Sequence, residues 1–322
     1  MRQQLPAAPG TASSVPRPGI ARAAELFKLR LVALVVVTTA VGFLMAHRGP
    51  WTGAWPRLAL TLVGTALAAA GSMALNQTME WRRDARMTRT CRRPIPAGAL
   101  APARARDAGL AVAAAGVALL AAAVNVLTAA LALAVVLLYT LVYTPMKVRS
   151  PFCTLAGAVC GAIPPMMGWS AATGSLAPGA LLLGGILFLW QIPHFLALAW
   201  LYRDDYRRGG FRMLPILDPS GALTGRLAAI YALALVGVTL TVSLAGMAGT
   251  VFAMGALLLG GWLAAVAARL AASRGQAEAR RLFLATLAYL PLLLALMLAD
   301  RRTAPSQPVP VLARAAAVNQ MP

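Results

Sequence analysis

The residues best suited to chemistry lie close together in one stretch, residues 76–98, with the sequence NQTMEWRRDARMTRTCRRPIPAG. Asn76, Glu80 and Asp84 follow one another at intervals of four residues. A helix turns about 100° per residue, so these side chains share one face and successive members stand about 6 Å apart along the axis. Two carboxylates and an amide oxygen are hard donors that suit a divalent cation. Ion pairing with the neighbouring arginines is the alternative interpretation of the same spacing.

A second pair of acids, Asp204 and Asp205, occupies a similar place. Of the nine acidic residues, only this pair and the pair of Glu80 and Asp84 are grouped, and each pair follows a long apolar run. Mg²⁺ binds through one or two carboxylates and phosphate oxygens, while Arg and Lys neutralise the remaining phosphate charge. These segments therefore predict a Mg²⁺–diphosphate site, with charge compensation at helix ends as the alternative. The basic residues close to the two acid pairs are Arg82, Arg83, Arg86, Arg89, Arg92, Arg93, Arg203, Arg207, Arg208 and Arg212. Lys147 and Arg149 lie between the pairs in sequence, in the segment YTPMKVRSP.

The elements that must position these residues are membrane-spanning helices. Of the 322 residues, 60% are hydrophobic and 12% are charged, and the mean hydropathy is +0.72. A soluble domain carries roughly twice that charged fraction. Runs of about 20 apolar residues mark transmembrane helices. We predict an all-α, polytopic membrane protein with nine spans, at 26–46, 58–79, 107–126, 128–144, 152–173, 177–201, 226–247, 250–272 and 281–299.

The basic residues indicate the orientation of the spans. With the N-terminus on the cytoplasmic side, 24 of the 29 Lys and Arg residues fall in the cytoplasmic segments. This is the positive-inside pattern, and it supports the number of spans independently. The net charge of +20 therefore does not indicate nucleic acid as a partner. Contact with anionic membrane lipid is a further use of the same charge.

The two ends of the chain differ from the apolar middle. Residues 1–24 are basic and rich in Pro, Ala, Gly and Ser, and residues 301–322 are similar, so both are predicted to be disordered tails around a membrane-embedded domain, 25–300. The start lacks the apolar segment of a cleavable signal peptide and the amphipathic helix of a transit peptide. We therefore expect the inner membrane of a bacterium, with the acid-bearing loops on the cytoplasmic side.

Several other residues in or near the spans are candidates for special roles. His194 is the only histidine inside a predicted span. Ionisable groups in a membrane are functional candidates, although a hydrogen bond to a carbonyl freed by Pro193 would also explain it. Pro164 and Pro165 are predicted to break the fifth span. The three cysteines show no metal-ligand spacing and are predicted to pack structurally.

Three ordered motifs make the chain resemble a known family. The pattern N-x3-E-x3-D-x2-M-x-R-T-x2-R-P-x-P-x-G, from Asn76 to Gly98, resembles the first aspartate-rich motif of the UbiA superfamily of intramembrane prenyltransferases. The segments 143–174 and 190–219, which contain PPMMGW and WQIPHF, resemble the protohaem IX farnesyltransferase branch of that superfamily. Glu80 stands where the wider superfamily has Asp. Asp204 and Asp205 are adjacent, where the wider superfamily has a D-x3-D motif.

The resemblance implies a helical bundle around a central cavity and a specific reaction. A farnesyl group passes from farnesyl diphosphate to the 2-vinyl group of haem b with addition of water, which gives haem O. It implies that Asn76, Glu80 and Asp84 hold Mg²⁺, and that Asp205 with Asp204 supports a second ion. The same resemblance suggests diphosphate contacts from Arg89, Arg93, Lys147, Arg149 and Arg203, and a haem pocket lined by Trp169, Trp190 and His194. Lys147 joins Asn76, Glu80, Asp84 and Asp205 in the expected catalytic set.

Two other functions stay open at this stage. The same enzyme class could prenylate an aromatic quinone precursor or a chlorophyll-like ring, although the PPMMGW and WQIPHF segments argue against it. A transporter or lipid-binding membrane protein could use the arginines for an anionic substrate. The resemblance implies farnesyl diphosphate, haem b and membrane lipid as partners, with a haem A synthase as a candidate protein partner.

Overall fold

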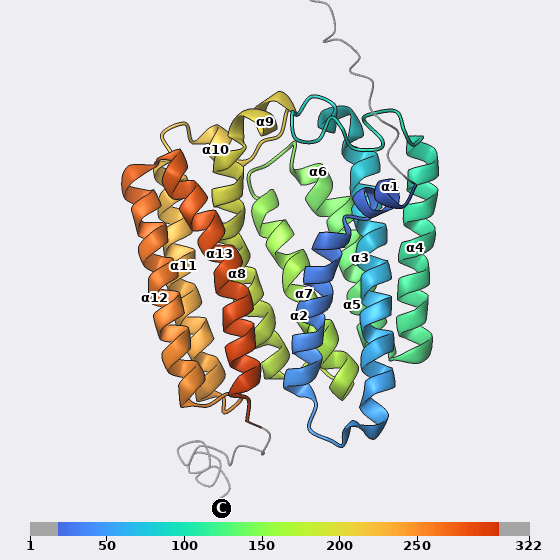
Figure 1. Cartoon of the computed structure of the whole chain (residues 1–322), viewed down its shortest axis with the longest axis vertical. Coiled ribbons are helices and arrows are strands. Elements are labelled where there is room, and N and C mark those ends of the chain that lie inside the picture. Colours follow the sequence, from blue (N-terminus) through green and yellow to red (C-terminus); the bar gives the residue numbers. More distant parts are fainter. Residues whose placement is uncertain (1–18, 303–322) are drawn as a thin grey trace, which may run out of the picture.

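The computed structural model describes residues 19–302, which are helical throughout apart from connecting segments (Figure 1). Within this range nine helical stretches are long and apolar enough to cross a membrane, which confirms the predicted class. Eight of the spans are formed by α2 (Leu29–Ala46), α3 (Ala54–Asp84), α4 (Pro102–Ala123), α7 (Cys153–Thr173), α8 (Pro178–Leu201), α11 (Ala222–Leu244), α12 (Thr250–Ser273) and α13 (Gln276–Ala299). The fourth span along the chain is formed by α5 (Val126–Leu137) together with the two short elements that follow it, up to Met146. The shorter elements are α1 (Gly19–Leu26), η1 (Trp51–Gly53), η2 (Leu138–Tyr143), α6 (Thr144–Met146), α9 (Arg203–Arg208) and α10 (Leu214–Leu217).

Two boundaries differ from the sequence prediction in ways that matter for the site. Helix α3 continues to Asp84 instead of ending near residue 79, because its polar last turns stay helical and pack against other elements. All three predicted oxygen donors therefore belong to one helix. Helix α1 starts at Gly19, inside the segment predicted to be a disordered tail. The rest of that tail and residues 303–322 lie outside the described residues.

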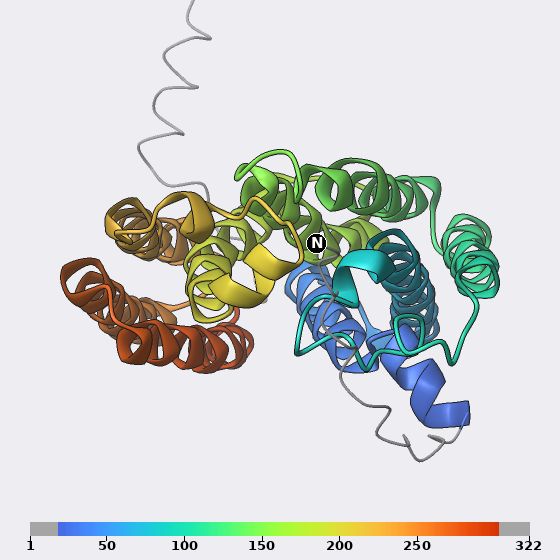
Figure 2. The ribbon, with the colours of Figure 1, turned by 90° about the horizontal axis from the view of Figure 1, so that it is seen from above.

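The spanning helices form two groups that meet along α7 and α8. Helices α3 and α4 pack along each other, α5 packs on α4 and α7, and α2 packs on α3 and α7. On the other side, α8 packs against α11 and α13, and α12 packs between those two. Figure 2 shows the two groups from above, with α2 in blue and α13 in red on the same side of the molecule. Helices α6, α9 and α10 lie at the same end as Asp84 (Figure 1).

Close packing through glycines holds α2 against α7. A Cβ atom on Gly42 would overlap the carbonyl oxygen of Pro165, and a Cβ atom on Gly168 would overlap that of Thr39. Small residues let membrane helices approach at backbone distance. The prediction that Pro164 and Pro165 break this span is wrong, since α7 runs through both. Neighbouring helices stabilise proline inside a span, and here the Pro165 backbone lies directly against α2.

A short π-helical segment, η2, connects α5 to α6 next to the acids of α3. Such segments are rare and are often found at functional sites. The wider turn lets the hydroxyl of Thr144 donate to the carbonyl of Tyr139 at 2.7 Å. It also places Tyr139 and Tyr143 next to each other, with ring centroids 5.1 Å apart. The irregular turn therefore presents the Thr144 hydroxyl and the Tyr139 ring toward α3, while the Tyr143 ring lies against Gly157 of α7.

Candidate functional site

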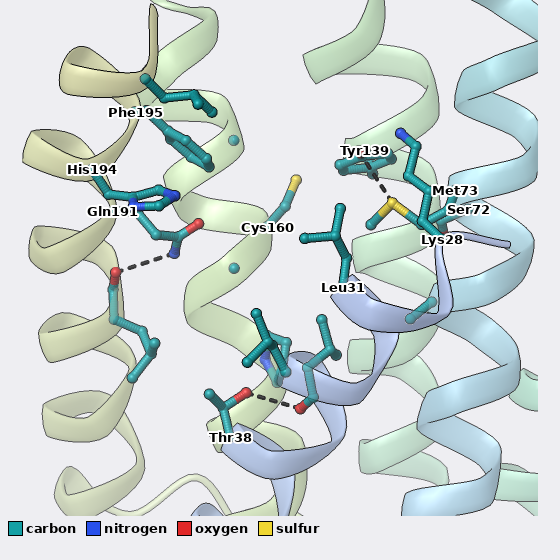
Figure 3. Close-up of a pocket in the computed structure, with 18 of the residues that line it drawn as sticks. Lys28, Leu31, Thr38, Ser72, Met73, Tyr139, Cys160, Gln191, His194 and Phe195 are labelled. Atoms are coloured by element: carbon teal, nitrogen blue, oxygen red, sulfur yellow. Dashed lines mark hydrogen bonds between the residues drawn. The ribbon is translucent and has the colours of Figure 1, made fainter. Parts of the chain in front are cut away.

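A cavity of about 720 Å³ lies between the two helix groups. Its lining comes from α2, α3, η2, α7, α8 and α13, and from the segment after α3. All the charged side chains of its lining come from α3, from the segment that follows it, and from the residues just before α2 and after α6. Figure 3 shows part of the wall, with His194 and Gln191 on one side and Lys28 and Tyr139 on the other.

The amide of Asn76 is held in one orientation by its neighbours. Its Nδ2 donates to the Thr144 hydroxyl at 3.1 Å, and that hydroxyl donates onward to the Tyr139 carbonyl. Its Oδ1 accepts from Nζ of Lys28 at 3.1 Å. Because an amide oxygen and nitrogen are assigned from such networks, the donor Lys28 and the acceptor Thr144 define which end of the Asn76 amide is the oxygen. The Asn76 oxygen therefore faces the ammonium group of Lys28 at the cavity wall.

The two carboxylates of α3 are both buried and each is paired with a base. Nζ of Lys147 lies 2.9 Å from Oε1 and 3.2 Å from Oε2 of Glu80, but only the second contact has hydrogen-bond geometry. Oε1 is thus a buried carboxylate oxygen without a hydrogen bond, and such an atom calls for a partner. Nη1 of Arg93 lies 2.7 Å from Oδ2 of Asp84, which is 1% exposed.

Lys28 is a cavity residue that the sequence reasoning missed, because it lies outside both acid-bearing segments and outside the three family motifs. It stands at the break between α1 and α2 in the left-handed backbone region, with φ 47°. Burial, followed by the charges of Arg93 and Lys147, lowers its pKa to about 7. A compositional signal could have found it: the chain has only two lysines, Lys28 and Lys147, and both line the cavity.

The charge of Lys147 is maintained despite its surroundings. Burial works against the ammonium, but the carboxylate of Glu80 outweighs that effect and holds the pKa of Lys147 above its ordinary value. The same ammonium lies 4.5 Å from the centre of the Tyr143 ring, a cation–π contact. Lys147 is thus a fixed positive charge at the end of the cavity that also contains Glu80.

The donor set fits a single Mg²⁺ bound together with a phosphate ligand. Mg²⁺ uses one or two protein carboxylates and takes its other oxygens from phosphate and water. The cavity offers two carboxylates and one amide oxygen. One oxygen of these carboxylates, Oε1 of Glu80, lacks a hydrogen bond. No cluster of three or more His, Cys, Asp or Glu suited to a metal occurs within residues 19–302, so a purely protein-made cage is absent there. The charged residues of the lining are Lys28, Glu80, Asp84, Arg89, Arg93 and Lys147, an excess of bases that favours an anionic ligand.

The rest of the cavity is apolar. Its wall on the α2 side includes Leu31, Leu34 and Val37, which are about half exposed. Leu287 and Leu294 of α13 line it as well. In a membrane, apolar side chains that are exposed on the protein surface face lipid. The apolar part of the cavity is therefore lined by side chains of two membrane-spanning helices, α2 and α13.

The structure does not bring the second acid pair to the cavity. Asp204 is exposed and pairs with Arg207 at 2.9 Å. Asp205 is buried but accepts a hydrogen bond from the backbone of Thr88 at 3.0 Å and pairs with Arg208. These contacts, stronger than the opposing effect of burial, hold the pKa of Asp205 below its ordinary value. Asp205 thus ties α9 to the segment that follows Asp84.

Of the other predicted site residues, some line the cavity and others do not. Arg89 lines the cavity, with its guanidinium 4.5 Å from the centre of the Tyr206 ring. Arg149 and Arg203 do not line it: Arg149 is exposed, and Arg203 stacks on Trp200. Trp190 and His194 line the apolar part.

Trp169 does not line the cavity either. It is packed in the protein interior against Gly179, where a Cβ atom would overlap its ring. Together with Arg149, Arg203 and the acid pair on α9, it is one of five predicted site residues that do not line the cavity. Position along a span predicted depth in the membrane, but the direction in which each of these side chains points depends on packing between helices.

The fold and the cavity together define a polytopic membrane protein with an internal cavity that is charged at one end and apolar elsewhere. Comparison with known families agrees with this description: the model of the UbiA prenyltransferase family matches residues 35–298. The chain belongs to the UbiA prenyltransferase family and is an intramembrane prenyltransferase.

Close relatives carry consistent names. The chain is 41% identical over 286 residues to a protoheme IX farnesyltransferase of Solibacter usitatus, a match that covers 86% of this chain and 97% of the relative. It is 45% identical over 287 residues to one of Anaeromyxobacter sp., covering 88% and 96%. The human mitochondrial protoheme IX farnesyltransferase is 44% identical over 285 residues, covering 88% of this chain and 63% of that protein.

Solved structures show the same fold at low sequence identity. A digeranylgeranylglyceryl phosphate synthase matches with a TM-score of 0.74 at 13% identity, covering 87% of this chain and 98% of the other. A UbiA homologue from Archaeoglobus fulgidus, solved with GPP and Mg²⁺, matches with a TM-score of 0.59 at 15% identity, covering 86% and 99%.

Proposed function

We propose that this protein is a haem O synthase, which transfers the farnesyl group of farnesyl diphosphate to the 2-vinyl group of haem b, with addition of water. One observation carries the proposal: in a chain 40–45% identical to proteins named protoheme IX farnesyltransferase, one cavity joins a pair of buried carboxylates and four bases to an apolar space. The charged end suits the diphosphate. The apolar part suits the farnesyl chain and the porphyrin.

The diphosphate end would act by electrostatic stabilisation. Asn76 Oδ1, Glu80 and Asp84 would hold Mg²⁺, which when bound supplies positive charge opposite the departing diphosphate. Lys147 and Arg93, already fixed against the carboxylates, would donate to phosphate oxygens that enter between them. Charges that are oriented before the reaction stabilise a leaving group without further reorganisation.

Lys28 and Arg89 would complete the diphosphate contacts from two further sides. Lys28 comes from the start of α2 and Arg89 from the segment after α3, so the ligand is surrounded by charges from separate elements. The two tyrosine rings beside Arg89 hold its guanidinium in place, at 4.8 Å from Tyr202 and 4.5 Å from Tyr206. We include Lys28 in the site and place Asp204 and Asp205 outside it, as residues that shape the cytoplasmic surface.

The apolar part would protect the reacting carbon. The bond between C1 and oxygen of farnesyl diphosphate breaks with its electron pair on the diphosphate, and the vinyl group of haem b attacks the resulting allylic cation. The new carbon–carbon bond leaves a cation next to the porphyrin, which takes a hydroxyl from water while a proton is released. A cavity that excludes bulk water lets the vinyl group react before water does.

The membrane setting follows from the same proposal. Both substrates are amphipathic, and the walls formed by α2 and α13 contact lipid. We place the acid end on the cytoplasmic side of a bacterial inner membrane, in line with the distribution of Lys and Arg. Haem O is the precursor of haem A, so a haem A synthase is a candidate partner that would receive the product.

An acceptor screen tests the proposal. The purified protein in lipid nanodiscs is given farnesyl diphosphate, Mg²⁺ and one of three acceptors: haem b, an aromatic quinone precursor or a chlorophyll-like ring. Mass spectrometry is expected to find a farnesylated, hydroxylated haem and no product with the other two. A prenylated aromatic acid or chlorophyll-like ring, with unchanged haem, would assign the enzyme to another acceptor class. If no product forms with any of the three acceptors, the proposed reaction is excluded.

A further inference from the structure

The protonation state of His194 can be read from its hydrogen bonds. Nδ1 of His194 lies 2.9 Å from the hydroxyl oxygen of Thr286. That hydroxyl donates its only hydrogen to the carbonyl of Phe283 at 2.6 Å. The oxygen must therefore accept from the imidazole, so Nδ1 carries the proton and Nε2 carries a lone pair. Among the described residues, no hydrogen bond engages Nε2.

The ring is also held by two aromatic neighbours. Its centroid lies 5.0 Å from those of Trp190 and Phe283, and both rings are nearly parallel to it, at 19° and 29°. Trp190 is itself anchored, because its indole nitrogen donates to the carbonyl of Thr286 at 2.9 Å. The imidazole therefore cannot turn easily, and Figure 3 shows it pointing into the cavity.

We propose that Nε2 of His194 is the axial ligand that binds the iron of haem b and so orients the porphyrin in the cavity. The inference rests on the proposed function, which makes haem b the substrate. A neutral imidazole is a common ligand of haem iron. Histidines that bind metals usually donate their other ring nitrogen to a second group, which fixes the ring, as Thr286 does here.

Other roles for the same nitrogen fit the contacts less well. A base at Nε2 would become an imidazolium, and neither its hydrogen-bond partner Thr286 nor the rings stacked on it carry a negative charge that would compensate that cation in an apolar wall. A haem propionate needs a hydrogen donor, and a neutral ring has none left at Nε2. Gln191 and Cys160 also line the cavity. The amide of Gln191 uses its nitrogen on the carbonyls of Ala158 and Leu187, which leaves only an amide oxygen, a poor ligand for haem iron.

The test is spectroscopic and needs no farnesyl diphosphate. Haem b is titrated into the full chain in nanodiscs, and optical absorption, electron paramagnetic resonance and resonance Raman spectra are recorded. We expect a histidine-bound haem with an iron–imidazole stretching band in the ferrous state. His194→Phe keeps the aromatic stack and removes Nε2, so the band is expected to disappear and haem affinity to fall by about tenfold or more. His47→Ala changes the only other histidine, in the loop after α2, and should leave the spectrum unchanged.

Two further variants separate ligation from folding. Thr286→Val keeps His194 but removes the acceptor of its Nδ1 proton, which should weaken the imidazole as a ligand and shift the stretching band without abolishing it. Cys160→Ser should leave the spectrum as it is. A spectrum unchanged in His194→Phe, lost in Cys160→Ser, or absent in the wild type would overturn the assignment. If His194 binds iron but no farnesylated haem forms, the proposed function fails while the ligand assignment stands.

Discussion

Single residues at the charged end of the cavity are arranged so that each oxygen donor of α3 has its own cation. Lys28 faces Asn76, Lys147 faces Glu80 and Arg93 faces Asp84. A buried carboxylate is costly unless it is paired, so the three bases stabilise these side chains on the face where a ligand can reach them. The same bases are then available to the diphosphate.

Removal of the carboxylates is expected to stop the reaction. Glu80→Gln and Asp84→Asn keep the size of each side chain but remove the charge that would hold Mg²⁺. Each change should lower the rate of haem farnesylation by about 100-fold or more, the usual cost of losing one group that stabilises transition-state charge. Asp107→Asn is the control, since Asp107 is exposed and pairs only with Arg106. Full activity in a variant that carries both Glu80→Gln and Asp84→Asn, with unchanged dependence on Mg²⁺, would show that the ion binds elsewhere.

Lys28 should matter for substrate binding in spite of its position outside the family motifs. Lys28→Met removes one charge-assisted hydrogen bond to the diphosphate, which is worth about 1.5–3 kcal/mol. Affinity for farnesyl diphosphate, measured by calorimetry in nanodiscs, should therefore fall by roughly 10- to 100-fold. Lys28→Arg should recover part of the loss. Arg30→Met is the control, because Arg30 is exposed two residues further along. Equal affinities for Lys28→Met and the wild type would exclude the contact.

The sequence predicted part of this site and could not predict the rest. A spacing of four residues within one helix places side chains on one face whatever surrounds the helix, and Asn76, Glu80 and Asp84 do line one cavity. Arg149 stands only two residues after Lys147, yet it points away, because a side chain at the end of a helix takes its direction from tertiary packing. The hydrogen bond between Asp205 and Thr88 joins residues 117 apart in sequence, which no local pattern contains.

At the level of elements, the cavity depends on how closely α2 approaches α7. Gly42 and Gly168 permit backbone contact between them, and this contact fixes one wall of the cavity. The nine spans were predictable because apolar length alone defines them. The continuity of α7 through its two prolines was not, since it results from the neighbouring helix. The π-helical segment η2 was not predictable either, because its hydrogen-bond pattern leaves no mark in composition.

Gly168→Ala should destabilise the protein. The added methyl group meets the carbonyl of Thr39 and the backbone nitrogen of Phe43, which cannot move without separating α2 from α7. We expect a loss of about 1–3 kcal/mol and a lower thermal midpoint in detergent. Gly261→Ala is the matched control on α12, where a Cβ atom would meet nothing within 4 Å. A midpoint for Gly168→Ala equal to that of the control would contradict the close approach.

The loop before α11 should give a stability that depends on pH. Asp218 accepts hydrogen bonds from the backbone and hydroxyl of Thr224 at 2.7 and 2.9 Å, and from Ser220. Although burial works in the opposite direction, these bonds hold the pKa of Asp218 below its ordinary value of 3.8. A lowered pKa stabilises the fold above pH 3.8 and loses that effect as pH falls below it.

Asp218→Ala is expected to cost about 1 kcal/mol at neutral pH, the usual value of a helix cap. The difference in thermal midpoint between the variant and the wild type should shrink as the pH is lowered toward 3. Asp204→Ala serves as the control, because the Asp204 carboxylate is exposed. A difference that stays constant down to pH 3 would show that the Asp218 carboxylate does not make the capping contacts in solution.

For the whole molecule, two groups of helices enclose one space that is charged at one end and apolar elsewhere (Figures 1 and 2). That arrangement would let the two proposed substrates enter from lipid while the leaving group stays at the charged end. The overall class could be predicted from composition, and the acceptor from three ordered motifs. The place of haem could not, because it depends on the direct contact between α8 and α13 at His194 and Thr286.

The most direct test of the account is a density map of the protein in a nanodisc with Mg²⁺ and a farnesyl diphosphate analogue that cannot ionise. The account predicts the diphosphate at the charged end of the cavity, with Mg²⁺ against Asn76, Glu80 and Asp84 and the farnesyl chain in the apolar part. Density for the diphosphate at Asp204 and Asp205, or outside the cavity among the surface arginines, would contradict it.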